Sequence, residues 1–282
     1  MKIAGIVTIY KEDSDVLDNI DSYIECVDKL YVVDNNDNDD FGKKINSKKI
    51  KYLPNYNNIG VASALNIGAK QALKDGYKWL LTMDQDSAFT SNNDLKKMID
   101  YLDNNDTKKI GLITPWHAIN TNPIKPKDQI DHPLEVMTSG NIINLSAYED
   151  VGGFKDEYFI DNIDIEYCMN LNSHGYHIDR LNYIELIHHL GDIKVRRIFK
   201  KKFICSNHNY IRRYYMSRNT FYLCDLYDKI YPDYCKFLKR ALRGQFTNIL
   251  LFEKDKIRKI RSFYRGYKDY KKRIVGKYPY KK

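Results

Sequence analysis

An apolar run that stops at two carboxylates constrains the fold of this chain more than any other stretch. The run Trp79–Met83 follows Gly76 and predicts a buried strand of a parallel sheet, because such strands are covered on both faces and need no alternation. Asp84 and Asp86 then lie at the carboxyl end of the strand, where α/β sheets bind their ligands. Two carboxylates at this spacing suit Mg²⁺ or Mn²⁺, although an isolated pair is more often an acidic turn.

The N-terminal part of the chain alternates strands and helices. We expect strands over 2–9, 30–33, 50–53 and 109–114 and helices over 14–27, 61–72 and 93–102. This order predicts an α/β fold with a mostly parallel central sheet, helices on both faces and a nucleotide-binding half over about 1–115. Neither a G-x-G-x-x-G turn after the first strand nor a Walker A loop occurs. A metal held by Asp84 and Asp86 is therefore the available means of neutralising nucleotide phosphates.

The region from 116 to 225 has a different pattern, and we expect it to form the acceptor half of the same domain. Residues 120–133 are polar and predict a surface loop. A strand over 135–145 is interrupted by Gly140, which indicates a bulge or the close approach of a ligand to the backbone. A helix that begins near Asp161 would place Asp161 and Asp164 on one face.

The basic charge is concentrated at the C-terminus. The net charge is +9, and residues 254–282 alone carry 13 basic and two acidic side chains. Apolar and aromatic residues are interleaved with these cations, as in helices that lie on anionic membranes. We expect 226–282 to be a helical basic extension that attaches the protein peripherally to the inner leaflet. A solvated extension used in a homodimer is the alternative; nucleic-acid binding is disfavoured, because the body has no RNA-binding fingerprint.

Cysteine spacing and the N-terminal sequence indicate the compartment. The five cysteines are widely spaced and form no C-x-x-C pair, so neither a disulfide framework nor a zinc site is indicated. Residues 3–7 predict a strand rather than a signal peptide, and no apolar run approaches the roughly 20 residues that span a bilayer. We expect a cytoplasmic protein that binds the membrane surface.

Seven ordered motifs give the chain a likeness to a known family. It resembles the GT-A-fold family 2 glycosyltransferases, and within them the bacterial rhamnosyltransferases. The motifs are Val32-Val33-Asp34-Asn35; Asn58-Ile59-Gly60-Val61-Ala62 with Ala64 and Asn66; Trp79 with Asp84-Gln85-Asp86-Ser87; Thr138-Ser139-Gly140; Gly152-Gly153-Phe154 with Phe159-Ile160-Asp161 and Asp164; His188-His189-Leu190-Gly191; and Tyr215 with Arg218-Asn219.

The resemblance implies a donor site and a metal site. Asp34 would hydrogen-bond the pyrimidine base, Asp84 would face the ribose or the metal, and Arg218 would lie near the diphosphate. The implied donor-binding set is Thr8, Tyr10, Asp34, Asn58, Gly60, Asp84, Gln85, Ser139, Gly140 and Arg218, and the implied metal ligands are Asp84, Asp86 and His188, for Mn²⁺ or Mg²⁺. The alternatives are a turn aspartate at 34, a structural histidine at 188 and a solvated basic face around 218.

The catalytic base is where the chain departs from the family pattern. An inverting transfer needs a carboxylate that deprotonates the acceptor hydroxyl. Many members supply it from a Glu-Asp pair followed by another Asp, but the usual base position here is Asn162, which cannot accept a proton usefully. Asp161 is the first candidate and Asp164 the second. Alternatively, both merely favour the positive N-terminus of a helix.

The implied activity is sugar transfer from a nucleoside-diphosphate sugar, either dTDP- or UDP-linked. The resemblance favours L-rhamnose from dTDP-rhamnose, moved to a saccharide acceptor carried on a polyprenyl diphosphate, in bacterial cell-surface polysaccharide synthesis. A UDP-hexose transferase of the same family is one alternative. A catalytically silent nucleotide-sugar-binding protein is another, which the asparagine at position 162 keeps open.

Overall fold

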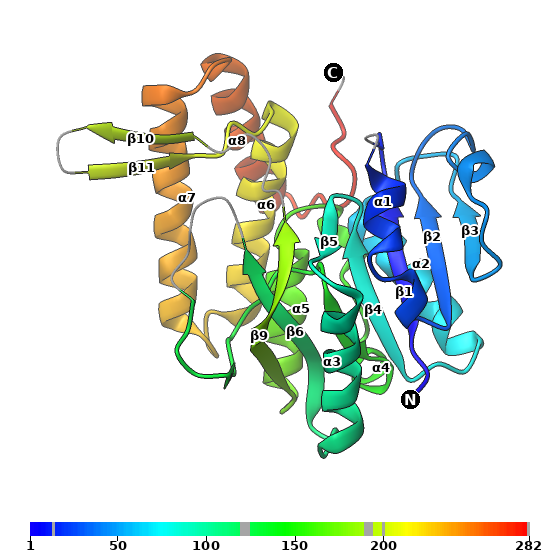
Figure 1. The fold of residues 1–282 in the computed structure, drawn as a ribbon. Coiled ribbons are helices and arrows are strands. Elements are labelled where there is room, and N and C mark those ends of the chain that lie inside the picture. Colours follow the sequence, from blue (N-terminus) through cyan, green and yellow to red (C-terminus); the bar gives the residue numbers. More distant parts are fainter. Residues whose placement is uncertain (13–14, 119–124, 189–193, 199–200, 281–282) are drawn as a thin grey trace. The chain divides into compact units, whose positions relative to one another are not determined.

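The computed structural model describes residues 1–12, 15–118, 125–188, 194–198 and 201–280, which form two compact units (Figure 1). As far as it is described, the first unit comprises residues 1–155 and 167–188, and the second comprises residues 156–166 and those from 194 on. The domain boundary expected at 225 therefore falls inside the second unit. The expectations for residues 120–124 and 189–191 lie outside the described part of the chain.

A mixed sheet forms the centre of the first unit. Within the described residues its strand order is β3-β2-β1-β4-β8-β6-β9-β5, and β7 pairs with β9. The β1–β2, β2–β3, β1–β4 and β6–β9 pairs are parallel, whereas β8, β5 and β7 pair antiparallel to their neighbours. The strands are β1 Ala4–Ile9, β2 Lys29–Asp34, β3 Ile50–Pro54, β4 Trp79–Asp84, β5 Ser87–Phe89, β6 Ile110–Ala118, β7 Ile130–Asp131, β8 Asn141–Asn144 and β9 His177–His188.

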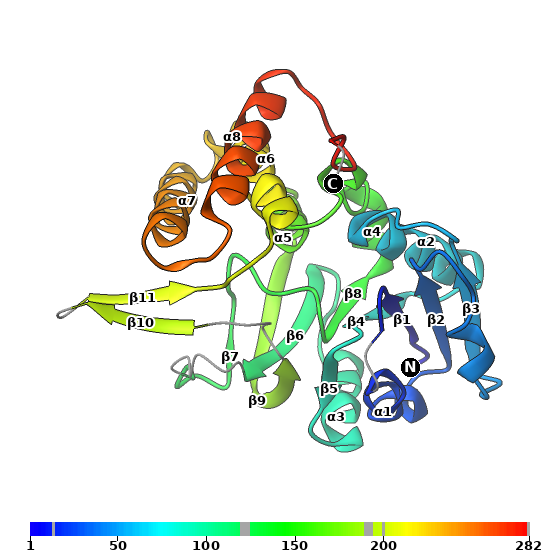
Figure 2. The same ribbon diagram turned by 90° about the horizontal axis from the view of Figure 1, so that it is seen from above.

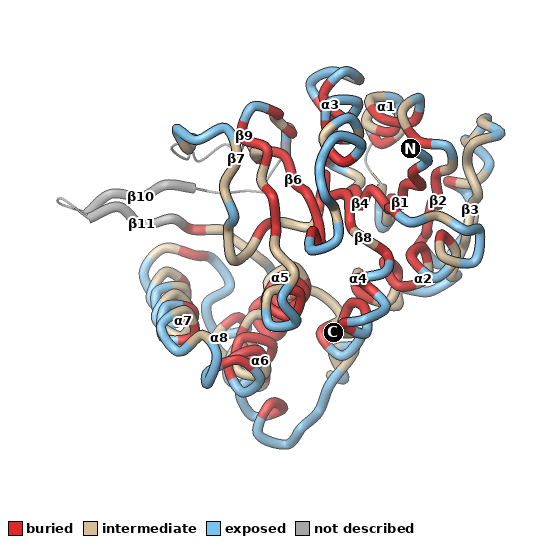
Figure 3. The backbone as a smooth tube through the Cα atoms, turned by 90° about the horizontal axis from the view of Figure 1, so that it is seen from below, coloured by how far each residue is buried: buried red, intermediate tan, exposed pale blue. Residues whose placement is uncertain are grey.

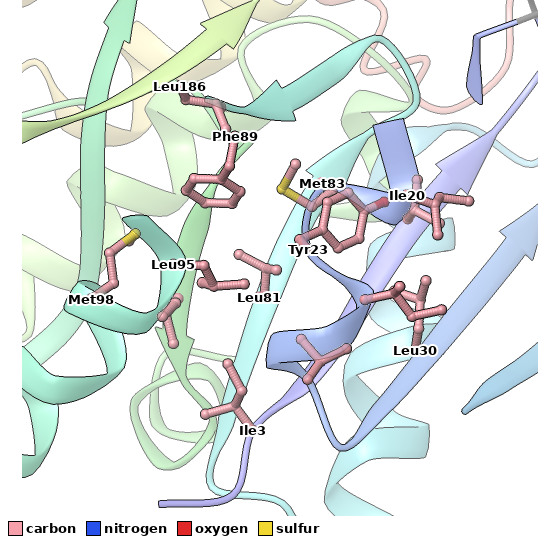
Figure 4. Packing of buried hydrophobic residues seen from close by; sticks show 14 of the residues in the cluster. Ile3, Ile20, Tyr23, Leu30, Leu81, Met83, Phe89, Leu95, Met98 and Leu186 are labelled. Atoms are coloured by element: carbon pink, nitrogen blue, oxygen red, sulfur yellow. The ribbon is translucent and has the colours of Figure 1, made fainter. Parts of the chain in front are cut away.

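Helices cover both faces of this sheet, as the sequence predicts (Figures 2 and 3). On one side lie α1 (Val16–Asp21) and α3 (Asn92–Asn104), and on the other lie α2 (Val61–Lys74) and α4 (Leu145–Asp150). Figure 4 shows the core on the α1 and α3 side, where buried residues of the helices and of β4 meet. These include Ile20, Tyr23, Leu81, Met83, Leu95 and Met98.

On the opposite face, α2 approaches the sheet closely because of one glycine. A Cβ atom at Gly68 would lie 2.1 Å from Cδ1 of Ile6 on β1. Any larger residue at this position would push α2 away from the sheet. Helix α2, which follows Asn58 and Gly60, is therefore fixed against β1, which ends at Ile9.

Several element boundaries differ from the sequence-based expectations. Strand β6 does not end at Pro115 but continues to Ala118, with a register irregularity against β9 at Pro115 that accommodates the missing N–H. Within 135–145 only Asn141–Asn144 is a strand. The helix expected over 14–27 ends at Asp21 and is followed by a separate 3₁₀ turn, Ile24–Cys26. Two further 3₁₀ turns are Gly42–Lys44 and Asp156–Tyr158.

The second unit is mainly helical. It contains α6 (Tyr210–Tyr227), α7 (Pro232–Phe252) and α8 (Lys256–Lys271), together with the β10–β11 hairpin, Lys194–Ile198 and Lys201–Cys205. Helix α5 (Ile163–Ser173) begins in this unit, two residues later than expected, so Asp161 precedes the helix. Among the described residues, no helix has both the length and the hydrophobicity needed to cross a membrane.

The basic C-terminal segment is an integral part of this unit rather than an extension. A Cβ atom at Gly266 of α8 would lie 2.3 Å from the carbonyl oxygen of Tyr214, so α6 and α8 are in backbone contact. Lys259 of α8 donates to buried Glu253 at 2.8 Å, and Arg213 of α6 donates to the other oxygen of that carboxylate. Removing one member of such a buried charge cluster leaves an unpaired charge, so this arrangement ties the helices together.

Candidate active site

Asp84 and Asp86 lie at the turn between β4 and β5. Strand β4 ends at Asp84, Gln85 and Asp86 form the turn, and Ser87 starts β5. Asp84 is half-buried and Asp86 is exposed. The expected pair of carboxylates is therefore present at the carboxyl end of β4, and Asp86 is more exposed to solvent than Asp84.

The backbone of His188 lies opposite this turn. His188 is the last residue of β9, and its Cα is the antiparallel partner of Ser87. The main chains that carry Asp86 and His188 are thus adjacent, although they are about 100 residues apart in the sequence. The side chain of His188 and all of His189 lie outside the described part of the structure.

The donor set at this turn fits a divalent cation. Two carboxylates from the turn are ligands that Mg²⁺ and Mn²⁺ prefer, and an imidazole from the adjacent strand is an acceptable ligand for Mn²⁺. Among the side chains that are described, no group of three His, Cys, Asp or Glu is arranged to hold a metal. The His188 side chain is not among them, so the predicted set Asp84, Asp86 and His188 stays a prediction.

Gln85 fixes the turn to its neighbours. Its side-chain oxygen accepts from the backbone N–H of Tyr10 at 2.7 Å, and its carbonyl accepts from the Asn19 amide at 2.8 Å. Thr8, two residues before Tyr10, pairs with Asp84 in the β1–β4 register. The glutamine between the two aspartates therefore connects the carboxyl ends of β1 and β4, while the Tyr10 ring stays exposed.

Ser139 and Gly140 are hydrogen-bonded to the end of β4. The Ser139 hydroxyl accepts from the N–H of Asp84 at 3.1 Å, and its carbonyl is hydrogen-bonded to Nε2 of His117 at 2.7 Å. Gly140 has a φ of +80°, and a Cβ atom there would lie 2.8 Å from Leu186. In the structure the close approach at this glycine is to protein side chains, and the donor contact expected for Ser139 and Gly140 stays a prediction. His117 is a buried residue that holds Ser139 through this hydrogen bond. The sequence did not indicate this role, because His117 lies in an apolar strand.

Asp34 is placed as a turn aspartate. Its side chain is fully buried, with Oδ1 accepting from the N–H of Asn36 at 2.8 Å and Oδ2 accepting from the Tyr52 hydroxyl at 2.6 Å. Burial, followed by this hydrogen bond, raises the pKa of Tyr52. The alternative of a turn aspartate gives each oxygen one partner, and the expected contact with a pyrimidine base stays a prediction.

A series of asparagines shapes the loop ahead of α2. Asn58 accepts from the N–H of Gly60 at 2.9 Å, and Gly60 adopts a φ of +92° as the residue before the helix. Asn35 donates to the carbonyl of Gly60 at 3.2 Å and accepts from Asn55 at 2.9 Å. Asn58 and Gly60 therefore set the backbone at the start of α2, a role that leaves the predicted donor contact untested.

Asn66 connects helix α2 to the Gly152-Gly153-Phe154 turn. This buried amide of α2 donates to the carbonyl of Phe154 at 2.7 Å and accepts from the Tyr148 hydroxyl and the Phe154 N–H. The asparagine thus fixes the turn through three hydrogen bonds within the first unit.

In the second unit, the segment ahead of α5 has an unusual backbone. Phe159, Asp161 and Asn162 have φ values of 65°, 67° and 61°, a left-handed conformation that non-glycine residues rarely adopt. Such conformations persist only where the surroundings impose them, and they cluster at functional sites. We call residues 158–162 the base loop, because it contains the first candidate base and leads to the second.

Asn219 of α6 holds the base loop in this conformation. Its side-chain nitrogen lies within 2.9 Å of the carbonyl oxygens of Tyr158, Ile160 and Asp161. The hydroxyl of Thr220, one residue on, accepts from the amide of Asn162 at 3.1 Å. In the sequence Asn219 was only part of a motif with Arg218, and its contacts in the structure are with this loop.

Arg218 is also structural. Its side chain is 0% exposed and donates to the carbonyls of Gly276 at 2.7 Å, Glu157 at 2.9 Å and Tyr158 at 3.1 Å. The guanidinium lies over the rings of Tyr214 and Tyr215. This placement replaces the expected diphosphate contact, and the alternative of a solvated basic face is wrong.

The two candidate bases have different surroundings. Asp161 is paired with Arg212, with Oδ1 2.6 Å from Nη2. Asp164, in the first turn of α5, accepts from the N–H of Ile165 at 2.9 Å, and no arginine or lysine is paired with it among the described residues. Burial raises the pKa of Asp164, and the negative charge of Asp161 adds to the increase. The two candidates thus differ in charge pairing and in burial, and which of them is the base stays a prediction. Arg212 was not singled out in the sequence.

Comparisons with known proteins agree with this reading of the fold. The family model described as glycosyl transferase family 2 matches residues 6–181. The dTDP-rhamnosyl transferase RfbF of Shigella flexneri is 29% identical over 214 residues, which cover 69% of this chain and 70% of RfbF.

Solved structures share the architecture at low sequence identity. The mannosyltransferase PcManGT of Pyrobaculum calidifontis, in complex with GDP-Man and Mn²⁺, has a TM-score of 0.59 at 11% identity, covering 94% of this chain and 73% of PcManGT. TarS 1–349 of S. aureus, in complex with UDP-GlcNAc, has a TM-score of 0.56 at 14% identity, covering 97% and 82%. A longer TarS structure extends beyond the match, which spans 37% of it.

Proposed function

The chain belongs to glycosyl transferase family 2, and from this premise we propose that it transfers L-rhamnose from dTDP-rhamnose to a saccharide acceptor with inversion at the anomeric carbon. The observation that carries the donor assignment is the 29% identity to a dTDP-rhamnosyl transferase over more than two thirds of both chains. The protein is thus a rhamnosyltransferase-like glycosyltransferase. The identity of the donor sugar and of its nucleotide base is our proposal.

The proposed reaction moves one proton and one sugar. An acceptor hydroxyl gives its proton to Asp164 while its oxygen attacks the anomeric carbon, and the bond from that carbon to the diphosphate oxygen breaks, releasing dTDP. The raised pKa of Asp164 supports this role, because a base must hold the proton that it takes. Asp161, paired with Arg212, orients the loop instead.

Divalent metal is proposed at Asp84, Asp86 and His188. A bound Mn²⁺ or Mg²⁺ would supply charge neutralisation for the leaving diphosphate. What supports this is the exposed carboxylate of Asp86 at the turn, together with the backbone pairing of Ser87 and His188. Donor contacts of Thr8, Tyr10, Asn58 and Gly60 belong to the same proposal.

The acceptor is proposed to be a saccharide on a polyprenyl diphosphate at the inner face of the membrane. The excess of basic residues in the C-terminal segment supports such an anionic surface. This location suits cell-surface polysaccharide synthesis, in which lipid-linked saccharides are extended.

The test is a donor screen on the full chain. Purified protein with Mn²⁺ is given dTDP-rhamnose, UDP-glucose or UDP-GlcNAc, and release of the nucleoside diphosphate is measured. We expect release from dTDP-rhamnose that Asp86→Ala abolishes and that Asp100→Ala, at an exposed position on α3, leaves unchanged. Release from a UDP-sugar alone would overturn the donor assignment, and no release from any donor would favour a binding protein.

A further inference from the structure

A pocket of about 580 Å³ lies among α6, α7 and α8, entirely within the second unit. Its volume is within the range of about 300–1,000 Å³ that is typical of small-molecule sites. Most of its lining is apolar and aromatic, with contributions from Phe221 on α6, Leu242 and Phe246 on α7, and Ile260 and Phe263 on α8. A mainly apolar pocket of this size is not needed to neutralise or hold a nucleotide.

The orientation of α8 explains why the pocket exists. Helices usually bury their apolar stripe against the protein. In α8 the buried residues are mainly polar or small, namely Lys259, Ser262, Gly266, Asp269 and Tyr270. The apolar residues of the same helix line the pocket or face solvent, and Ile257 and Tyr264 are 77% and 56% exposed. The backbone contact at Gly266 fixes this orientation.

Two basic residues line the pocket. They are Lys239 and Arg243 of α7, beside Thr247, and Lys239 is also ion-paired with Asp228 at 3.5 Å. Helix α8 carries seven basic residues and one acidic residue, and α7 carries four basic residues and one acidic residue. A second copy of the chain docked through this face would bring these like charges together, whereas an anionic partner would be attracted.

We propose that this pocket binds a hydrocarbon chain of an anionic membrane phospholipid, with the phosphate of its head group at Lys239 and Arg243. Apolar lining and a cationic rim are the two features that such a ligand matches. The inference deepens the proposed attachment to the inner leaflet. It is tested without sugar transfer, so that its failure and that of the proposed activity can be told apart.

The first experiment uses a soluble probe, dodecyl phosphate below its micelle concentration, titrated into the full chain by calorimetry. We expect one equivalent to bind, and inorganic phosphate not to compete. Thr247→Trp, at an exposed position of the pocket lining, should weaken binding at least about tenfold, because the indole fills the space for the chain. Equal binding by this variant would overturn the proposal.

The second experiment separates the pocket from general basicity. Lys239→Gln/Arg243→Gln is compared with Lys236→Gln/Arg240→Gln, which removes the same charge from exposed positions of α7 outside the pocket. In flotation with vesicles containing phosphatidylglycerol, the first pair should lose most of the binding and the second little. Equal losses would overturn the pocket as the cause. A wild-type dimer that Thr247→Trp dissociates in sedimentation would also overturn it, by making this face an interface between copies.

Discussion

Arg212 neutralises Asp161 through two hydrogen bonds, from Nη2 to Oδ1 at 2.6 Å and from Nε to Oδ2 at 3.4 Å. Asp164 lacks such a pairing among the described residues, and burial raises the pKa of its carboxyl. The contrast between the two aspartates gives the first prediction.

Asp164→Asn should lower kcat by about 10²–10⁴-fold, the usual contribution of a general base. The variant should also melt at a higher temperature at neutral pH. Since the folded state raises the pKa of Asp164, its ionised form is disfavoured there, and the stability contribution present at low pH is lost as the pH rises through the folded pKa. Asparagine removes that cost and keeps the acceptor for Ile165. Unchanged turnover would exclude Asp164 as the base.

Asp161→Asn should behave in the opposite way. Loss of the ion pair with Arg212 should lower the melting temperature, while turnover falls by less than about tenfold, because the change affects loop position and not the proton acceptor. Both aspartate variants are measured with dTDP-rhamnose under the same conditions. A collapse of turnover in Asp161→Asn with full activity in Asp164→Asn would restore Asp161 as the base.

Asn219→Ala should reduce kcat with little change in donor affinity. The substitution removes the donor that lies near three carbonyls, so the left-handed conformations at Phe159, Asp161 and Asn162 lose support. Thr220→Val, which removes one acceptor for Asn162, should have a smaller effect of the same kind. Steady-state kinetics together with nucleotide titration distinguish this from global unfolding; a weakened nucleotide affinity with unchanged kcat would contradict it.

The stability of the second unit should fall as the pH drops from about 6.5 to about 4. Burial, with the nearby charge of Arg212, lowers the pKa of His208 to about 4. Over this interval the unfolded chain binds a proton that the folded chain does not, so acid favours unfolding. His208→Gln should flatten the pH dependence of the melting temperature in this window, and His174→Gln serves as the control. An identical pH profile for wild type and His208→Gln would refute this origin.

Mn²⁺ binding should depend on Asp86 without any substrate present. Titration followed by electron paramagnetic resonance should show affinity reduced at least about tenfold in Asp86→Ala, since the ion loses a charged ligand. Asp100→Ala is the matched control, because it removes an exposed carboxylate from α3. Equal affinities in wild type and Asp86→Ala would place the metal elsewhere.

The sequence predicted the parts of this fold that depend on local pattern. The apolar run Trp79–Met83 is the buried strand β4, and the helix over 61–72 is α2. Both have a periodicity that a single stretch of sequence records. The end of β6 was predicted too early, because its partner β9 is distant in sequence, and the contact of Gly140 with Leu186 leaves no local signal for the same reason.

The resemblance to a known family located part of the candidate site. Asp84, Gln85 and Asp86 are at the edge of the sheet where the sequence places them. Arg218 was misassigned, because a motif identifies a residue but not the atoms that it contacts. The pairing of Asp161 with Arg212, on which our proposed choice of Asp164 depends, spans 51 residues and leaves no local signal in the sequence.

The support of the base loop depends on residues that are synthesised late. Arg218 bridges Glu157 and Gly276, and the N–H of Gly276 donates to the carbonyl of Glu157 at 2.8 Å. During translation, the hydrogen bonds that join Glu157, Arg218 and Gly276 cannot all form until Gly276 has been synthesised. A chain cut by a protease before this glycine would keep every proposed donor and metal residue. It would lack the hydrogen bonds to Gly276 that help to hold its base loop. Intact and shortened copies would thus differ in catalysis while competing for the same nucleotide sugar.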